Sequence, residues 1–206
     1  MSRARIIAGA IQLVDDEGLQ ALSMRKLGAV LGVEAMSLYN HVHNKDDVLD
    51  GMCDEIMSQM VVPDLEAPWP QRMRTLLIEV RQVLLAHPGV LPLFGTRPPV
   101  TPTGFAPVEM LHRVSVEAGL GHDRDLDAFL LVGSFLLGYL RIDEGRMRQI
   151  DGDPSAPYER WTGTEHQPAV ELGRSLVSRD WDAEFERCLD LVIGSLVALA
   201  DLPAPS

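Results

Sequence analysis

The side chains best placed to do chemistry lie between Ala35 and Lys45. Leu38 and Val42 are four residues apart and can anchor the inner side of a short helix, which leaves its outer side to polar groups. Hydroxyl, amide and imidazole groups on such a face can hydrogen-bond to the phosphates and base edges of nucleic acid. The residues available for that face are Met36, Ser37, Asn40 and His41.

A preceding helix and a tight turn would hold this face in place. Ser23 is a good N-cap for a helix at 24–31, and Gly32 can take the positive φ that a turn after Leu31 requires. The side chains expected to face an earlier helix are Leu27, Val30 and Leu31. This is the layout of a helix-turn-helix whose second helix enters the major groove. Two short helices joined by Leu-Gly-Val also occur in bundles with no nucleic-acid partner, so the spacing alone leaves both interpretations open.

Several short runs resemble, in order and spacing, the DNA-binding domain of the TetR family of repressors. They are Arg25-Lys26-Leu27, Leu31-Gly32-Val33-Glu34, Ser37-Leu38-Tyr39, His41-Val42 and Asn44-Lys45. Further along, Gly95-Thr96-Arg97-Pro98 and Gly133-x-Phe135-x-Leu137-Gly138 resemble the tetracycline repressor branch, and the C-terminal block resembles its dimerisation helix. The resemblance is strong over 3–60, moderate beyond, and leaves 151–168 unmatched.

By position, the resemblance implies a set of DNA contacts. The residues are Arg25, Lys26, Ala35, Met36, Ser37, Tyr39, Asn40, His41 and Lys45. Arg25 can read guanine or grip a phosphate, and Lys45 adds positive charge at a helix N-terminus. The tetracycline repressor has a glutamine and a proline where this chain has Ala35 and Met36. Apolar contact with a thymine methyl group, and therefore a different operator, is expected at those two positions.

The net charge of −12 argues against a protein that coats nucleic acid nonspecifically, because Lys and Arg supply most of that affinity. Residues 1–50 carry five basic side chains against seven acidic ones, a balance of −2, and the remainder carries the other −10. Specific DNA binding is compatible with this charge if the basic side chains gather locally.

We expect a soluble, cytoplasmic protein that is not an enzyme and needs no cofactor or metal. No N-terminal stretch has the order of a signal peptide, and the longest apolar run, 128–140, is too short to span a bilayer. Cys53 and Cys188 lie far apart and suggest neither a disulfide framework nor a metal knuckle. The sequence has no phosphate-cradling glycine loop, nucleophile elbow or His-rich metal motif.

Glycine and proline divide the chain into helix-length blocks without the strict alternation of β-branched residues that strands show, which predicts an all-α protein. The expected helices are 3–17, 24–31, 35–41, 45–61, 69–86, a short one near 88–94, 103–119, 123–148, 167–177 and 181–201, with a surface loop at 151–168. Residues 1–45 would form a three-helix helix-turn-helix domain, and 46–206 a larger ligand-sensing and dimerisation domain in which 46–61 is the connecting helix.

A homodimer is expected, because a single short recognition helix gives little affinity and proteins of this type read two half-sites. The last helix has an apolar row formed by Phe185, Leu189, Val192, Leu196 and Leu199, with further apolar and small residues beside it. Gly133 and Gly138 would permit close approach of another helix. We therefore predict a four-helix bundle of 123–148 and 181–201 with their symmetry mates. The alternative is that both are core helices of a monomer.

Methionine and aromatic residues of the second domain suit an apolar pocket as well as a core. The candidate ligand-binding residues are Met57, Met60, Val80, Leu84, Phe94, Phe105, Met110, Phe129, Phe135 and Tyr139. The resemblance implies that some of them line a cavity whose occupation moves the DNA-binding heads. Leu93 stands where the tetracycline repressor has a magnesium-binding histidine, and Ile142, next to Asp143, stands at its supporting acid. A metal-free, more apolar effector is therefore expected.

The sequence thus predicts a ligand-responsive repressor that binds a palindromic operator as a homodimer and is released by a small, largely apolar effector. The alternative is a helical interaction or scaffold protein without DNA binding.

Overall fold

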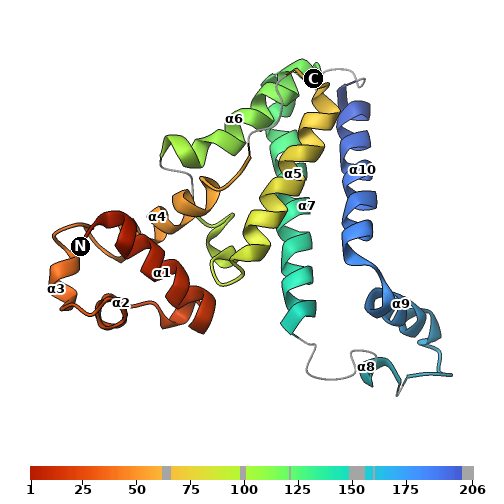
Figure 1. The fold of residues 1–206 in the computed structure, drawn as a ribbon. Coiled ribbons are helices and arrows are strands. Elements are labelled where there is room, and N and C mark those ends of the chain that lie inside the picture. The colour runs from red at the N-terminus through yellow and green to blue at the C-terminus, as the bar shows by residue number, and fades with distance from the viewer. Residues whose placement is uncertain (62–65, 98–100, 121, 149–155, 160, 201–206) are drawn as a thin grey trace.

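The computed structural model describes residues 1–61, 66–97, 101–120, 122–148, 156–159 and 161–200. Over these ranges the chain forms helices and turns without a strand, which confirms the all-α prediction. Figure 1 shows a small N-terminal head joined through one helix to a larger bundle. The head contains α1 (Arg3–Glu17), the short 3-10 helix η1 (Leu19–Ala21), α2 (Met24–Leu31) and α3 (Ala35–Leu38), and α4 (Lys45–Met57) joins it to the bundle. None of the described helices is long and apolar enough to cross a membrane.

Local signals set the bounds of α2. The Ser23 hydroxyl accepts a hydrogen bond from the Lys26 amide at 3.2 Å, and Gly32 ends the helix with a φ of +71°. Leu27 is fully buried, and Leu31 packs so closely on α1 that a Cβ at Gly9 would lie 2.8 Å from it. The prediction that Val30 also faces α1 is wrong, because its side chain is 53% exposed.

The second helix of the motif is shorter than the predicted 35–41. It ends at Leu38, whose carbonyl accepts from both the His41 amide, at 2.9 Å, and the Val42 amide, at 3.1 Å. One carbonyl thus takes both donors, a pattern common at helix ends, and residues 39–41 form a turn. Leu38 and Val42 are both buried, as predicted for its inner anchors.

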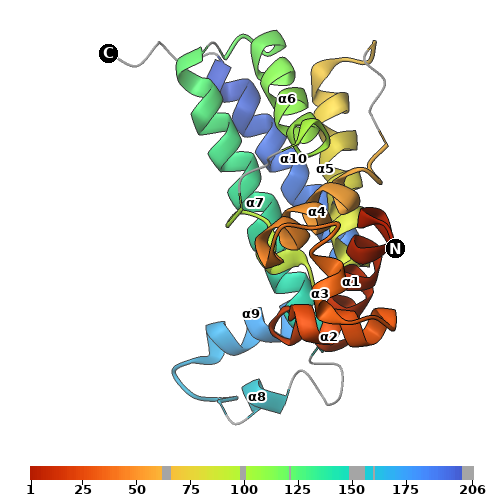
Figure 2. The same cartoon turned by 90° about the vertical axis from the view of Figure 1, so that its left-hand side faces the viewer.

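The bundle is built from α5 (Trp69–Ala86), α6 (Pro102–Glu117), α7 (His122–Arg148) and α10 (Trp181–Ala200). Helices α5, α7 and α10 pack against one another, and α6 packs on α5 and α7 while also reaching α4 (Figures 1 and 2). The block predicted near 88–94 is only a 3-10 turn, η2 (Leu91–Leu93). The predicted helix 45–61 ends at Met57, where the Ser58 amide still donates to the Asp54 carbonyl.

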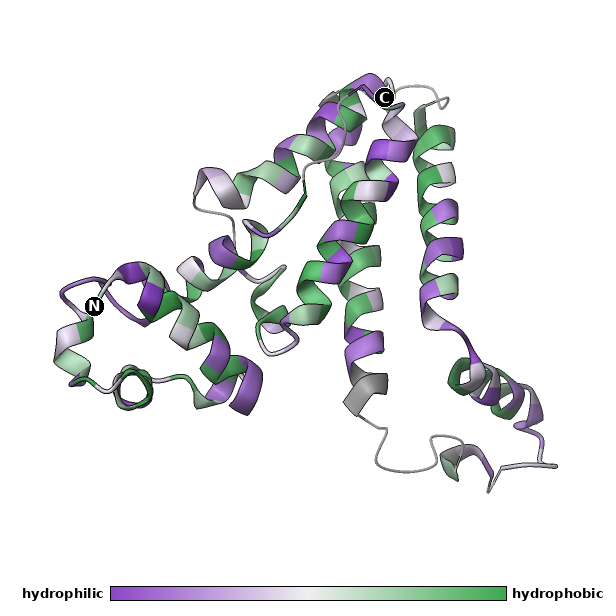
Figure 3. Ribbon diagram, viewed as in Figure 1, coloured by the Kyte–Doolittle hydropathy of each residue, from purple (hydrophilic) through white to green (hydrophobic). Residues whose placement is uncertain are grey.

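The core where α5, α7 and α10 meet contains an aromatic cluster beside a buried arginine. The rings of Phe135 and Phe185 stack at 5.7 Å between centroids, and Tyr139 contacts Phe185 edge-on at 5.1 Å. Arg81 lies 4.7 Å above the Phe185 ring and pairs with Asp143 at 2.9 Å. Figure 3 shows hydrophobic residues recurring between hydrophilic ones along α5, α7 and α10.

The segment predicted as a surface loop at 151–168 contains a helical turn. Helix α8 (Ala156–Glu159) precedes α9 (Gln167–Ser178), while 149–155 and 160 lie outside the described residues. The two helices pack on each other, since a Cβ at Gly173 would lie 2.3 Å from the Tyr158 ring. In Figures 1 and 2 they project beyond the end of the bundle.

Candidate functional site

Helix α3 and the turn that follows it present side chains to solvent above a buried leucine. Met36 is 75% exposed and Tyr39 is 44% exposed, while Leu38 between them is fully buried. Asn40 and His41 are also exposed, and the half-buried members of the predicted DNA-contact set are Ala35 and Ser37. These residues therefore lie on one short segment, which the buried Leu38 anchors to the head.

Some basic side chains of the head are free to meet an anion, and others are already paired. Within the described part of the chain, Arg5, Arg25 and Lys45 have no carboxylate partner. They come from α1, α2 and the first position of α4, the helix that joins the head to the bundle. Lys26, in contrast, pairs with Glu17 at the end of α1. Three cations of the head are thus not neutralised by a neighbouring carboxylate, despite the acidic balance of the whole chain.

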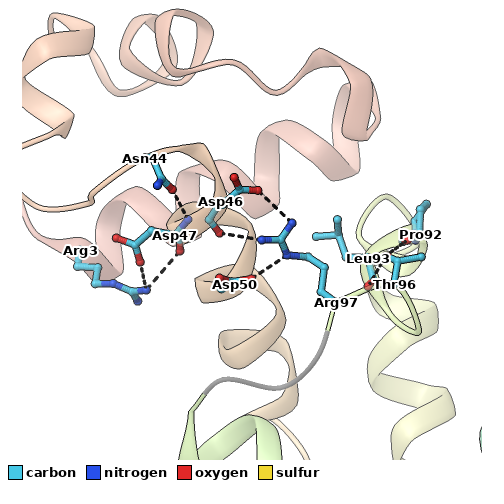
Figure 4. Close-up of polar contacts among 9 residues, drawn as sticks. All are labelled: Arg3, Asn44, Asp46, Asp47, Asp50, Pro92, Leu93, Thr96 and Arg97. Atoms are coloured by element: carbon cyan, nitrogen blue, oxygen red, sulfur yellow. Dashed lines mark hydrogen bonds and ion pairs between the residues drawn. The ribbon is translucent and has the colours of Figure 1, made fainter.

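The carboxylate of Asp47 links the start of α4 to α1 (Figure 4). The Asn44 side chain accepts from the Asp47 amide at 2.9 Å, and Asp47 accepts from the His43 amide and from Arg3, each at 2.8 Å. Burial acts to raise the pKa of Asp47, but the hydrogen bonds from His43 and Arg3 outweigh it and hold the pKa below its ordinary value. The charged form of Asp47 therefore stabilises the position of α4 against α1.

Replacing Asp47 by asparagine should lower the free energy of unfolding by about 1 kcal/mol at neutral pH, since the side chain is only 21% exposed. Because the folded pKa is lowered, this stabilisation is complete above the ordinary value of about 3.9 and is lost as pH falls through the folded value. Urea unfolding of both proteins across the acid range measures the difference. A difference in unfolding free energy that persists in strong acid would contradict this role of the Asp47 carboxylate. The control is Glu55→Gln on the exposed side of α4, which should show no such difference.

The head also docks on the bundle through the turn after α5. The Nδ1 atom of His87 lies 2.8 Å from the Oδ2 atom of Asp15, near the end of α1. A Cβ at Gly89 would lie 2.3 Å from the Val14 carbonyl oxygen, so only glycine permits this approach. These two contacts hold α1 against the bundle, and α4 provides the second connection between the head and the bundle.

A cavity of about 680 Å³ lies between α4 and the bundle, a volume suited to a drug-sized ligand. Its walls come from α4, α5, the turn at 94–97, α6 and α7. Most of the wall is apolar. The polar lining residues are Asp50, Cys53, Asp54, Thr96, Arg97 and Ser134.

The structure places half of the predicted ligand-binding residues on the cavity wall. Those that line it are Met57, Val80, Leu84, Phe94 and Phe129. Those that do not are Met60, Phe105, Met110, Phe135 and Tyr139. Phe135 and Tyr139 belong to the aromatic cluster with Phe185, so for these two the prediction of a cavity position is wrong, and Phe105 is an exposed residue of α6. Met110 is buried in the core.

Sequence reasoning missed a row of three aspartates on α4, of which Asp50 and Asp54 line the cavity and Asp46 is exposed. Arg97 donates to Asp50 at 2.7 Å and to Asp46 at 3.2 Å, and this hydrogen bonding raises the pKa of Arg97 above its ordinary value (Figure 4). One turn further along, the Thr101 hydroxyl donates to Asp54 at 2.5 Å. The signal that could have shown this row is the i, i+4, i+8 spacing of the three aspartates, which puts them on one helix face.

Leu93 and Ile142, the two positions that the resemblance compared with a metal site, both lie outside the cavity wall. Leu93 is buried and does not contribute to the cavity wall. Ile142 is 60% exposed, and the neighbouring Asp143 pairs with Arg81 in the core. Within the described ranges, no group of three His, Cys, Asp or Glu side chains is arranged to hold a metal ion.

Comparison with known proteins gives the same architecture. Residues 62–199 match the tetracyclin repressor-like C-terminal domain. An HTH-type transcriptional regulator of Saccharopolyspora erythraea is 32% identical, over 98% of this chain and 87% of the relative. The class D tetracycline repressor of Escherichia coli is 29% identical, over 77% of this chain and 74% of the repressor. The structure of ActR from Streptomyces coelicolor in complex with actinorhodin superposes with a TM-score of 0.85 at 27% identity, covering 99% of each chain.

The match of the C-terminal domain covers more than half of the chain, and the sequence similarity to a named regulator extends through the helix-turn-helix head. The chain belongs to the TetR family of transcriptional regulators.

Proposed function

We propose that the protein is a repressor that binds a palindromic operator as a homodimer and leaves it when a small, largely apolar effector enters the cavity. The observation that carries this proposal is α4, which begins at Lys45 in the head and contributes Asp50, Cys53, Asp54 and Met57 to the cavity wall. One rigid helix thus joins the surface proposed to bind DNA to the space proposed to bind the effector. We further infer that the protein acts by binding, without an enzymatic step, and works in the cytoplasm.

In this proposal, residues 1–45 are the DNA-binding domain and 46–206 the ligand-sensing and dimerisation domain. The segment from Met36 to His41 enters the major groove with its exposed side chains, and the unpaired Arg25 and Lys45 contact phosphates or a guanine edge. Lys26 has a lesser part because Glu17 already neutralises it. A footprint on DNA upstream of its own gene should show two half-sites about 34 to 36 Å apart, and protection of a single half-site would contradict the symmetric arrangement.

The proposed dimer uses the outer faces of α7 and α10. The inner row of α10 is buried within its own chain, whereas Leu191 is 73% exposed and is followed at helical spacing by Gly194, Ser195 and Ala198. A Cβ at Gly138 or at Gly194 would meet nothing within 4 Å. The exposed apolar residues of α7 that lie outside the cavity wall are Leu126, Leu131 and Ile142. Apolar surface beside small residues on two adjacent helices supports a four-helix bundle with a second copy.

Coupling between the two sites is assigned to the ion pairs of Arg97. This residue lines the cavity and binds Asp46 and Asp50 of α4, so a ligand that displaces the turn at 94–97 must also displace α4 or break these pairs. A shift of α4 carries the head with it, because Asp47 of the same helix is bound to Arg3 of α1.

Arg97→Gln should loosen α4 in the free protein. Loss of both ion pairs should make the amides of 45–57 exchange hydrogen about ten-fold faster, a change of about 1.4 kcal/mol in local opening. Hydrogen exchange with mass spectrometry measures this. Arg187→Gln, which breaks an exposed pair with Glu184 on α10, is the matched control and should leave 45–57 unchanged. Equal exchange of α4 in wild type and Arg97→Gln would refute the coupling role.

A further inference from the structure

The cavity wall carries more negative side chains than positive ones. Arg97 is the one cationic side chain among the described lining residues, and Asp50 and Asp46 already bind it. The Thr96 hydroxyl donates to the Leu93 carbonyl at 2.9 Å and carries no charge. Burial raises the pKa of Cys53 to about 12, against the opposing effect of Arg97, so this thiol also stays neutral. The carboxylate that remains without a cation is that of Asp54.

Asp54 has a single side-chain partner in the described part of the chain. Its Oδ1 atom accepts a hydrogen bond from the Thr101 hydroxyl, and it forms no ion pair there. The same Thr101 oxygen accepts from the Gly104 amide at 3.3 Å and so caps the start of α6. Asp54 therefore lies where α4, the start of α6 and the cavity meet. Its carboxylate can accept hydrogen bonds from further donors.

A ligand that fills the cavity removes water from this carboxylate. A buried charge without a partner is strongly unfavourable, so a purely apolar ligand would oppose its own binding at this edge. A ligand that brings a cation would instead form a charge-assisted hydrogen bond in surroundings of low polarity. The apolar remainder of the wall would hold the body of the same molecule.

We propose that the effector carries a positively charged group, such as a protonated amine, on an apolar ring-sized body, and that Asp54 binds this group. The inference rests on the proposed function of the cavity as the effector site. It adds the charge of the ligand to the apolar character already expected. Because Asp54 belongs to α4, the effector would hold the helix that carries the DNA-binding head.

The test compares two dyes of the same ring system, proflavine, which is a planar cation at pH 7, and acridine, which is neutral. Fluorescence and calorimetric titrations of the full-length protein, without DNA, give both dissociation constants. Wild type should bind proflavine about ten-fold or more tightly than acridine, the effect of one hydrogen bond to a charged group. Asp54→Asn keeps an acceptor for Thr101 but removes the charge, and should abolish most of this preference.

Two controls separate binding from structure. Glu55→Gln removes the same charge from the exposed side of α4 and should keep the preference. Thr101→Val removes the hydroxyl partner and should also keep it, whereas a purely structural Asp54 would make Thr101→Val resemble Asp54→Asn. Thermal melts establish that each variant is folded, and Asp54→Ser carries the same expectation should Asp54→Asn fail to fold.

Three outcomes would overturn the proposal: equal affinity of wild type for both dyes, absence of saturable proflavine binding, or an undiminished preference in Asp54→Asn. Operator binding is measured separately by mobility shift in the absence of dye. Failure of wild type to bind any operator would refute the regulatory function, while the dye titrations would still report the charge preference of the cavity.

Discussion

Replacing Tyr39 and Lys45 together by alanine should abolish specific operator binding and leave the dimer intact. Both side chains are exposed and neither supports the core, so the head should keep its fold. A two-fold dimer loses four contacts, and at about 1 kcal/mol each the affinity should fall by about three orders of magnitude. Fluorescence anisotropy with labelled operator gives the affinity, and light scattering gives the mass.

Arg113→Ala is the matched control for that experiment, since it removes an exposed cation from α6, outside the head. It should change operator affinity only slightly, through the weak effect of total charge. If the double variant kept wild-type affinity, the segment from Met36 to Lys45 would not be the DNA-binding surface.

Leu191→Glu should convert the dimer into a monomer and weaken operator binding by about 100-fold or more. The side chain is 73% exposed in the single chain and lies beside Gly194 on the outer face of α10. Around a two-fold axis each new carboxylate would meet its copy in an apolar contact, which strongly opposes association. Operator affinity falls with it, because linking two heads supplies a gain of about 100 to 10,000-fold.

Val116→Glu is the control for Leu191→Glu, because Val116 is 56% exposed on α6, outside the proposed interface. Sedimentation velocity at micromolar concentration should return dimer mass for wild type and Val116→Glu and monomer mass for Leu191→Glu. A wild-type protein that is monomeric, or a Leu191→Glu variant that remains dimeric, would place the interface elsewhere or remove it.

The helix-turn-helix could be predicted because its signals are local. Ser23 and Gly32 bound α2 through contacts with their own neighbours, and Leu38 and Val42 mark the buried side of the next turn. Val30 was mistaken for a packed residue because apolar character shows only that burial is possible. The early end of α3, where two amides share one carbonyl, leaves the apolar spacing of Leu38 and Val42 unchanged, so the spacing did not predict it.

The cavity could be predicted only in part, because its lining depends on how distant segments meet. Phe129 and Phe135 lie on the same helix with similar surroundings in sequence, yet one lines the cavity and the other stacks in the core. The pairing of Arg97 with Asp50 joins residues 47 positions apart and follows from the docking of the turn at 94–97 on α4. Such contacts are products of tertiary packing.

We expect this chain to recognise a specific DNA sequence through its N-terminal head. Fluorescence anisotropy of labelled DNA from upstream of its own gene, titrated with protein over a range of salt concentrations, tests it most directly. Saturable binding is predicted that survives an excess of unrelated DNA and weakens steadily as salt rises, because phosphates are neutralised at each half-site. Absence of specific binding to any upstream sequence, even at low salt, would contradict it.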